Sequence, residues 1–351
     1  MNPRNLGKSG LMVAPLCLGM MSYGSPSWAP WVLDKGEASR FVGLALDHGL
    51  NFFDTADFYS YGASEEGLGA ALAGVPRGEV VLSSKVGVPM NGKPTMRGNS
   101  RKHLRDAIEA TLRRLKTDYL DLYLLHVWDD TTPIGETIDA LERLVDQGKI
   151  LYYGASNFRS WQLSHAQQQA LLAGGRGFTA MQLQYNLVCR DDERDTLPLC
   201  GIEGIGVMVY SPLARGWLVG GDTDVARLTE RERARVEKDV KSQAIYGSAA
   251  DRQVRACLLQ LARERDVPPG RIALAWLLAR PHVSTIIVGA LEPHHLREAV
   301  AALDLTLTAA ELQLLDAAYV PGGSAGIGGV RAGGYKELLA QQQQLATQGS
   351  N

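Results

Sequence analysis

The sequence predicts an α/β fold, a (β/α)8 TIM barrel with an N-terminal β-hairpin and extra C-terminal helices. The chain has 351 residues and is 45% hydrophobic, which is enough apolar side chain for a large core. Eight short apolar runs alternate with amphipathic helical patterns, as expected for parallel strands buried on both faces. A barrel of eight such units typically takes about 250 residues. The predicted strands are Val13–Leu18, Leu50–Phe53, Val80–Ser84, Leu120–Leu125, Ile150–Ala155, Ala180–Tyr185, Gly206–Tyr210 and Val283–Val288.

Local signals predict the other elements in chain order. A hairpin over Arg4–Leu11 turns at Lys8-Ser9-Gly10. Apolar residues recur every three or four positions over 104–115, 134–145 and 254–261, which predicts helices there. Thr132 followed by Pro133 is typical of a helix N-cap with proline in the first turn.

The C-terminal part begins with a helix and ends in a different composition. Thr308 and Glu311 form a capping box for a last helix that ends near Tyr319. We therefore expect a single barrel domain over 1–320 and a flexible Gly/Gln-rich tail over 321–351. A two-domain α/β arrangement is the alternative, but no linker rich in Pro, Ser and Gly interrupts 30–310.

Charge and hydropathy exclude two classes of protein. Lys plus Arg number 36 against 38 Asp plus Glu, for a formal net charge of -2, and no basic stripe indicates a nucleic-acid groove. No apolar run approaches the roughly 20 residues of a membrane-spanning helix.

The cysteines indicate a reducing compartment. Four scattered residues with no Cys-x-x-Cys pair fit buried thiols of a cytoplasmic protein. The apolar run Leu11–Met21, which follows basic residues, resembles a signal peptide. Pro15 and Gly19 interrupt it, and no small-x-small cleavage site follows, so we interpret it as containing the first strand. The cysteines are Cys17, Cys189, Cys200 and Cys257.

Two glycine-rich patterns do not qualify as nucleotide-binding motifs. In the near P-loop from Gly87 to Lys93, Pro94 stands where a Mg²⁺-binding Ser or Thr belongs, and no helix begins there. The pattern Gly322–Gly328 follows no strand, and too little chain remains after it for βαβ units.

Polar residues end most of the predicted strands. In a barrel these ends open onto the C-terminal face, where the active sites of this fold lie. The residues are Asp54-Thr55, Lys85, His126, Ser156-Asn157, Gln182 and Tyr210-Ser211.

Four side chains of complementary type can converge on this face if Tyr59 reaches in from the loop after Asp54. The ordinary tyrosine pKa of about 10 is too high for easy proton transfer, and an adjacent Lys85 ammonium is expected to lower it by about 1–3 units. Asp54 would keep Lys85 protonated, and His126 can donate a hydrogen bond to a carbonyl oxygen. Such a group suits hydride addition to a carbonyl, which implies a nicotinamide cofactor because no side chain supplies hydride.

The sequence resembles the aldo-keto reductases over residues 5–319. In particular, it is similar to bacterial members related to potassium-channel β subunits. Several specific motifs occur in the family's order. They are Asp54-Thr55-Ala56-Asp57-Phe58-Tyr59, Ser83-Ser84-Lys85, Asp118-Tyr119-Leu120-Asp121-Leu122-Tyr123 running to His126, Gly148-Lys149-Ile150, Gly154-Ala155-Ser156-Asn157, Tyr210-Ser211-Pro212-Leu213 and Val288-Gly289-Ala290.

The resemblance implies roles for the site residues. Tyr59 would be the proton donor, with Asp54, Lys85 and His126 completing a catalytic tetrad. The carboxamide of the nicotinamide would bind Ser156, Asn157 and Gln182, and Tyr210 would stack on its ring. Ser211, Leu213, Arg215 and Gly216 would line the pyrophosphate site. The remaining implied cofactor contacts are Met20, Met21, Pro212, Gly289, Ala290, His295 and Glu298, of which Gly289, Ala290, His295 and Glu298 would lie near the adenosine; no metal is implied.

Departures from the family pattern affect the expected cofactor. The segment Leu218–Asp222 lacks the usual Lys, Leu291 stands where a Ser, Lys or Arg commonly meets the 2′-phosphate, and His295 and Ala299 replace the usual Gln and Asn. Fewer cations weaken discrimination between NADP and NAD. We expect NADP(H), with NAD(H) possible and Arg227 or Arg297 as replacement cations. The unusual tail also leaves one wall of the substrate pocket undefined.

The expected substrate is a small carbonyl compound. Aromatic residues on the predicted loops of the C-terminal face favour aryl aldehydes, ketones or sugars, with Tyr23, Trp31 and Trp128 as candidate contacts. Most such residues in proteins only pack loops onto the barrel. The sequence leaves the oligomeric state open.

Two other functions remain open on the same fold. One is a redox-sensing regulatory protein, like potassium-channel β subunits, although those tend to carry Asn at the position of His126. The other is a dehydrogenase that oxidises a sugar or secondary alcohol.

Overall fold

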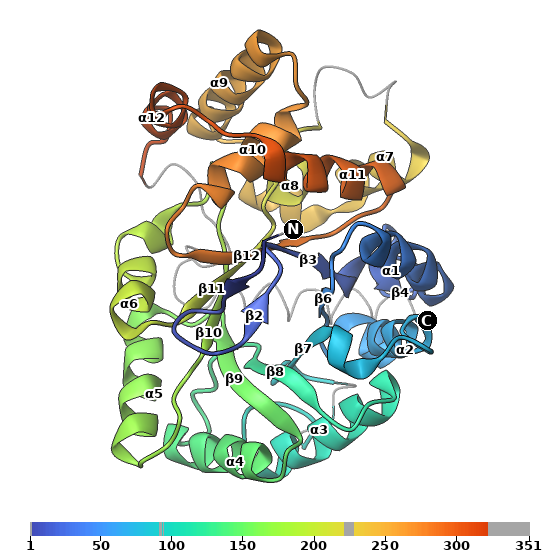
Figure 1. The fold of residues 1–351 in the computed structure, drawn as a ribbon, viewed down its shortest axis with the longest axis vertical. Helices are drawn as coiled ribbons and strands as arrows, with labels where there is room; N and C mark the ends of the chain where they lie inside the picture. Colours follow the sequence, from blue (N-terminus) through green and yellow to red (C-terminus); the bar gives the residue numbers. More distant parts are fainter. Residues whose placement is uncertain (1, 91–92, 94, 221–227, 322–351) are drawn as a thin grey trace.

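Eight parallel strands close into a barrel in the computed structural model, which describes residues 2–90, 93, 95–220 and 228–321 (Figure 1). Their order around the barrel is β10-β11-β12-β3-β6-β7-β8-β9. Each strand therefore pairs with the barrel strands that come before and after it in the chain, and the last strand, β12, pairs with the first, β3. The predicted (β/α)8 fold is confirmed. The strands are β3 (Leu16–Gly19), β6 (Phe52–Asp54), β7 (Val81–Val86), β8 (Leu120–Leu125), β9 (Ile150–Ser156), β10 (Ala180–Gln184), β11 (Gly206–Tyr210) and β12 (Val283–Val288).

Helices surround the strands and bury their apolar stripes against them. On α3, Leu104 and Ile108 are fully buried, as their spacing predicts, and Ser100 caps the helix by accepting a hydrogen bond from the N–H of His103. The helices that follow the barrel strands include α1 (Ala38–Asp47), α2 (Ala63–Ala71), α3 (Arg101–Leu115), α4 (Ile134–Asp146), α5 (Ser160–Leu172), α6 (Thr196–Glu203), α10 (Pro269–Leu278) and α11 (Pro293–Ala301).

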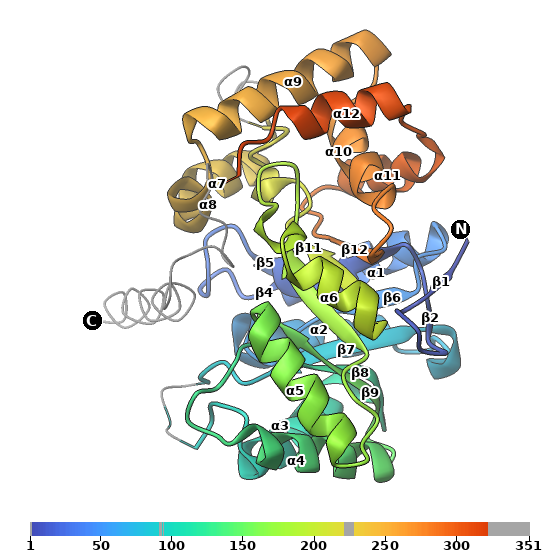
Figure 2. The ribbon, with the colours of Figure 1, turned by 90° about the vertical axis from the view of Figure 1, so that its left-hand side faces the viewer.

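Further helices follow β11 and end the described chain. Figure 2 shows α7 (Glu230–Lys238) and α8 (Val240–Ile245) on the side of the barrel away from β1 and β2. Above the barrel in that view, α9 (Ala249–Arg265) runs beside α12 (Ala309–Ala317). The capping box of Thr308 and Glu311 begins α12 as predicted. The predicted tail after residue 321 lies outside the described residues, as does the glycine pattern at 322–328.

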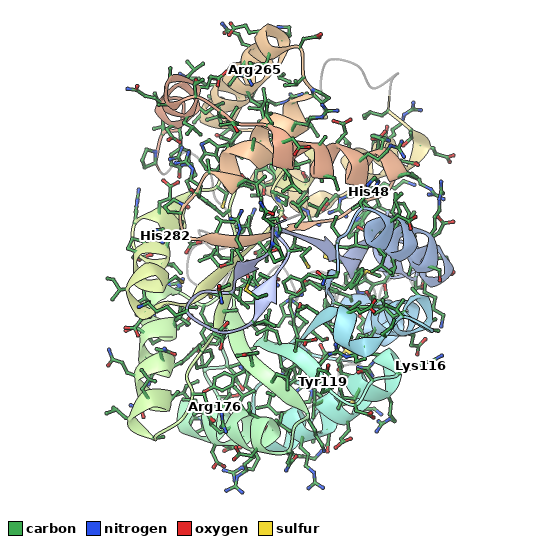
Figure 3. All side chains as sticks on the ribbon, viewed as in Figure 1. His48, Lys116, Tyr119, Arg176, Arg265 and His282 are labelled. Atoms are coloured by element: carbon green, nitrogen blue, oxygen red, sulfur yellow. The ribbon has the colours of Figure 1, made fainter. Side chains whose placement is uncertain are left out.

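The N-terminal hairpin covers the end of the barrel at which the strands begin, where Lys8 and Arg4 bond to the Gly204 and Val283 carbonyls. Its strands β1 (Arg4–Asn5) and β2 (Met12–Val13) pair antiparallel. Leu6 and Val13 are fully buried in the same cluster as Cys17 and Phe52, which face the barrel interior. Figure 3 shows side chains filling the space within the ring of strands, so the barrel is a packed core.

Several predicted boundaries are wrong, and for two of them the structure shows the reason. The first barrel strand begins at Leu16 and not at Val13, because Met12–Val13 pairs with β1 in the hairpin. Helix α4 begins at Ile134 with Pro133 as N-cap, so Thr132 is not the capping residue. The Thr132 hydroxyl instead donates to Asp129, at 2.7 Å.

The four cysteines are free thiols, and Cys17, Cys189 and Cys200 are buried. Burial raises the pKa of the Cys17 thiol well above its ordinary value, which makes the thiol unreactive. Within the described ranges, no helix is both long and apolar enough to cross a membrane.

Asp129 organises the loop that follows β8. One oxygen accepts from the N–H of Asn99 at 2.8 Å and the other from the N–H of Thr131 at 2.9 Å. Burial opposes ionisation, but these and the hydroxyl hydrogen bonds lower the pKa of Asp129 to about 2. The loop before α3 is thereby tied to the segment that leaves the barrel beside His126.

We expect Asp129→Asn to lower the free energy of unfolding by about 1–2 kcal/mol at pH 7, because an amide nitrogen would face a backbone N–H donor. A folded-state pKa below the ordinary value stabilises the protein above about pH 4, and this contribution is lost as pH falls toward 2. Urea unfolding at several pH values measures the difference, with the exposed Asp118→Asn as control. A pH-independent difference would contradict the role of the carboxylate.

Candidate active site

A cavity of about 450 Å³ opens at the carboxyl ends of the strands. Tyr59, His126 and Tyr210 line one end of it. The other end reaches the N-terminal turns of α10 and α11. The cavity is thus elongated, running from a cluster of titratable groups to two helix termini.

Asp54 and Lys85 form a buried ion pair at the ends of β6 and β7. The Lys85 Nζ lies 2.6 Å from Asp54 Oδ2 and also donates to the Thr55 carbonyl at 2.7 Å. Burial opposes the charge on Lys85, but Asp54 and Tyr59 outweigh that effect and raise its pKa, so the side chain is an ammonium. The neighbouring Asp54 oxygen accepts from Gln182 at 2.9 Å, so the amide donor predicted to bind a carboxamide is engaged by Asp54.

Tyr59 lies in the loop after β6, with its hydroxyl 3.2 Å from the Lys85 Nζ. The next two residues, Ser60 and Tyr61, have φ of 50° and 52°, a left-handed conformation that is strained for both. The Ser60 hydroxyl holds the turn by accepting from the N–H of Ser25 at 3.0 Å. The loop therefore places the phenol against Lys85 at a cost in backbone strain.

The expected lowering of the Tyr59 pKa is wrong for this structure. Burial raises the pKa of Tyr59, and Lys85 offsets only part of the rise. The phenol therefore keeps its proton at neutral pH, as a proton donor must.

His126 stands at the end of β8 opposite Tyr59. Its backbone N–H donates to the Val86 carbonyl at 2.8 Å, and its ring meets the Tyr59 ring edge-on, with centroids 5.8 Å apart. The four residues predicted to act together, Asp54, Tyr59, Lys85 and His126, thus lie side by side.

Asn157 connects the ends of β8, β9 and β11. It adopts a φ of 58°, and its amide nitrogen donates to the His126 carbonyl at 3.1 Å and to Ser156 Oγ at 2.9 Å. The Tyr210 hydroxyl donates to Asn157 Oδ1 at 2.7 Å, which holds the ring of Tyr210 at the cavity wall.

Two arginines share one carboxylate in the middle of the cavity. Arg215 binds Asp239 at 2.7 Å, and Arg235 of α7 binds the same oxygen at 3.1 Å. The Arg235 guanidinium lies 3.5 Å from the ring centroid of Trp31, and its Nη1 is buried without a hydrogen-bond partner within the described part of the chain. Burial and then Arg215 lower the pKa of Arg235 to about 9. Asp239 therefore compensates only one of the two positive charges that Arg215 and Arg235 bring to the cavity wall.

Three of the four residues predicted to lie near the adenosine line the cavity. Gly289, His295 and Glu298 line the cavity, whereas Ala290 is buried behind it. Of the proposed replacement cations, Arg297 is exposed and does not line the cavity, and Arg227 lies outside the described residues. The other predicted cofactor contacts all line the cavity, namely Met20, Met21, Ser156, Asn157, Gln182, Tyr210, Ser211, Pro212, Leu213, Arg215 and Gly216.

Of the three candidate substrate contacts, Trp31 lines the cavity, whereas Tyr23 and Trp128 do not. Tyr23 is fully buried, and its hydroxyl donates to the Ala290 carbonyl at 2.7 Å. Trp128 packs edge-on against Phe158 and Trp161, at 5.2 and 5.6 Å between centroids, outside the cavity lining. Both therefore pack loops onto the barrel.

Several lining residues were not predicted. Glu232 and Arg235 lie on α7, and His294 lies in the first turn of α11 beside His295. The Thr229 capping box signals a helix at α7, but charged residues at these positions are typical of any solvated helix. Only the packing of α7 across the cavity identifies them.

A nicotinamide dinucleotide fits this cavity. Its pyrophosphate is an anion that the unpartnered Arg235 Nη1 can satisfy, and the elongated shape can accommodate two nucleotide halves.

Comparison with known proteins agrees with the geometry. The family model described as the aldo/keto reductase family matches residues 15–320. The chain is 35% identical over 335 residues to the versiconal hemiacetal acetate reductase of Aspergillus parasiticus, covering 90% of this chain and 96% of that protein.

Two further relatives have similar coverage. The aldo-keto reductase dtxS3 of Metarhizium robertsii is 34% identical, with 90% of each chain covered. The uncharacterized oxidoreductase YrpG of Bacillus subtilis is also 34% identical, over 91% of this chain and 96% of that protein. From the barrel, the tetrad and these similarities, we conclude that the chain belongs to the aldo/keto reductase family of oxidoreductases.

Proposed function

We propose that this protein reduces aldehydes or ketones to alcohols with a nicotinamide dinucleotide, using Tyr59 as the proton donor. The observation that carries the proposal is the continuous contact from Asp54 through Lys85 to the Tyr59 hydroxyl, at 2.6 and 3.2 Å, at one end of an elongated cavity. The sequence favours NADP(H) as the cofactor.

The residues divide the chemistry between them. A dinucleotide held in this cavity would supply the hydride for the carbonyl carbon. Tyr59 Oη gives its proton to the carbonyl oxygen. The hydride brings two electrons and one hydrogen and the tyrosine brings the second hydrogen, so the carbonyl is reduced to an alcohol. Lys85 stabilises the tyrosinate that remains, and Asp54 keeps Lys85 charged and oriented. His126 faces the same space as Tyr59 and orients the carbonyl oxygen.

The cavity wall suggests where each part of the cofactor is held. Tyr210 offers a ring for stacking beside the tetrad, and Ser156 and Asn157 lie next to it with polar groups. Arg215, Arg235 and the Ser211–Gly216 turn would hold the pyrophosphate. Trp28 and Trp31 line the mouth and favour a substrate with an apolar or aromatic face.

The test is steady-state oxidation of NADPH, with NADH alongside, against aryl aldehydes, aliphatic aldehydes, diketones and aldoses. We expect turnover on at least one carbonyl class, with aryl aldehydes among the best. Dinucleotide binding without turnover on any of these compounds would overturn the proposal in favour of a regulatory protein.

A further inference from the structure

The far end of the cavity is lined by a carboxylate and imidazoles. Glu232 of α7 reaches His295 of α11, with its Oε1 2.8 Å from the His295 Nε2 and 3.3 Å from the His294 Nε2. Figure 1 shows α7 and α11 adjacent at this end of the barrel. Burial opposes ionisation of Glu232, but hydrogen bonds from Thr229 and His295 lower its pKa, so the group is an anion at neutral pH.

His295 adds no positive charge here. Its Nδ1 accepts from the N–H of Leu291 at 3.1 Å and of Glu292 at 3.4 Å, so in the hydrogen-bond network the ring proton belongs on Nε2, which donates to Glu232. Burial lowers the pKa of His295, which keeps the ring neutral. The same proton occupies the position that a metal ion would need, so the three side chains are better explained by their hydrogen bond than by a bound cation.

The N-terminus of α11 is already capped by its own side chains. The His295 ring accepts from the N–H groups of Leu291 and Glu292, which immediately precede the helix, and the Glu292 carboxylate faces the N–H of His295 in a capping box. Pro293 at the first helical position has no N–H. Pro293 therefore offers no backbone donor to a phosphate at this terminus, and an acidic side chain faces the donor of His295.

The described arginines near this end are paired with other groups, and Arg227 lies outside the described residues. Arg271 forms two hydrogen bonds with Glu298, at 2.6 and 3.0 Å. Arg231 points to Glu37 and to the Leu291 carbonyl, at 3.4 Å each. Among the described residues that line the cavity, the arginines are Arg215 and Arg235, and both bind Asp239.

We infer that Glu232 is a specificity-determining residue that selects NAD(H) over NADP(H). The inference rests on the proposed function: with the nicotinamide half at Tyr59, the other half of the dinucleotide must occupy this end. A carboxylate accepts a hydrogen bond from the free 2′-hydroxyl of a ribose and repels a 2′-phosphate. Each Glu232 oxygen retains accepting capacity besides its present bonds. The inference reverses the cofactor preference expected from the sequence.

Calorimetric titration of the purified protein with NAD⁺ and with NADP⁺, without substrate, tests the inference. We expect NAD⁺ to bind at least about tenfold more tightly than NADP⁺. In Glu232→Gln, NAD⁺ should bind about tenfold more weakly, because the acceptor loses its charge, and NADP⁺ should bind more tightly. Glu230→Gln removes the same charge from an exposed position on the same helix and should leave both affinities unchanged.

Other results of the titrations would overturn either the inference or the proposed function, and the two cases can be told apart. Tighter binding of NADP⁺ by the unmodified protein would overturn the inference and leave the proposed function intact. An unchanged affinity ratio in Glu232→Gln would also overturn it, and a melting curve shows whether that variant is folded. Binding of neither dinucleotide would overturn the proposed function itself.

Discussion

Replacing Tyr59 with phenylalanine is expected to remove nearly all carbonyl reduction while dinucleotide binding stays unchanged. The substitution deletes the one hydroxyl that contacts Lys85, at 3.2 Å, and leaves the ring packed against Trp28 and His126. Loss of a positioned general acid typically reduces turnover by about 10²–10⁴-fold. Steady-state kcat and a binding titration on the same preparation measure both effects.

A matched control lies two residues away. Tyr61 shares the strained turn, with a φ of 52°, but its side chain is 41% exposed, so Tyr61→Phe removes a hydroxyl without touching Lys85. Its kcat should remain near that of the unmodified protein. If Tyr59→Phe retained more than a tenth of normal turnover, Tyr59 would not be the proton donor.

Lys85→Met is expected to reduce both activity and stability. Tyr59 would lose the charge that stabilises its phenolate, so kcat should fall by at least about 100-fold. Asp54, only 2% exposed, would be left without its cation, which typically costs about 3–5 kcal/mol of unfolding free energy. Chemical denaturation and steady-state kinetics give the two quantities.

The double variant Asp54→Asn, Lys85→Met separates the two effects. With neither charge present, most of the lost stability should return, because residue 54 no longer carries an unpaired buried charge. Turnover should stay low, since Tyr59 still lacks its ammonium neighbour. Recovery of turnover along with stability would show that Lys85 acts only by supporting the fold.

Much of the fold follows from local sequence. The eight apolar runs predict the eight barrel strands, and the polar residues at their ends predict which side chains meet on one face. Strand direction makes this possible: the carboxyl ends of parallel strands in a closed barrel all face the same way. Asp54, Lys85 and His126 are therefore brought together by topology that their own runs encode.

Other features depend on contacts between distant segments. Pairing with β1 places Met12–Val13 in the hairpin, although the apolar run Val13–Leu18 predicts a single strand. Tyr23 and Trp128 lie on loops of the expected kind, but the neighbours that bury them come from elsewhere in the chain.

In the candidate active site, too, some features follow from the sequence and others from the tertiary structure. The residue types in the sequence determined that an acid, a cation and an imidazole would share the barrel rim. The tertiary structure alone decided their electrostatics: burial outweighs Lys85 and raises the pKa of Tyr59. It also placed Glu232 and Arg235 of α7 over the cavity. The alternation of strand and helix patterns predicts a parallel barrel, whereas desolvation and the charge at a cavity wall depend on every segment packed around the site.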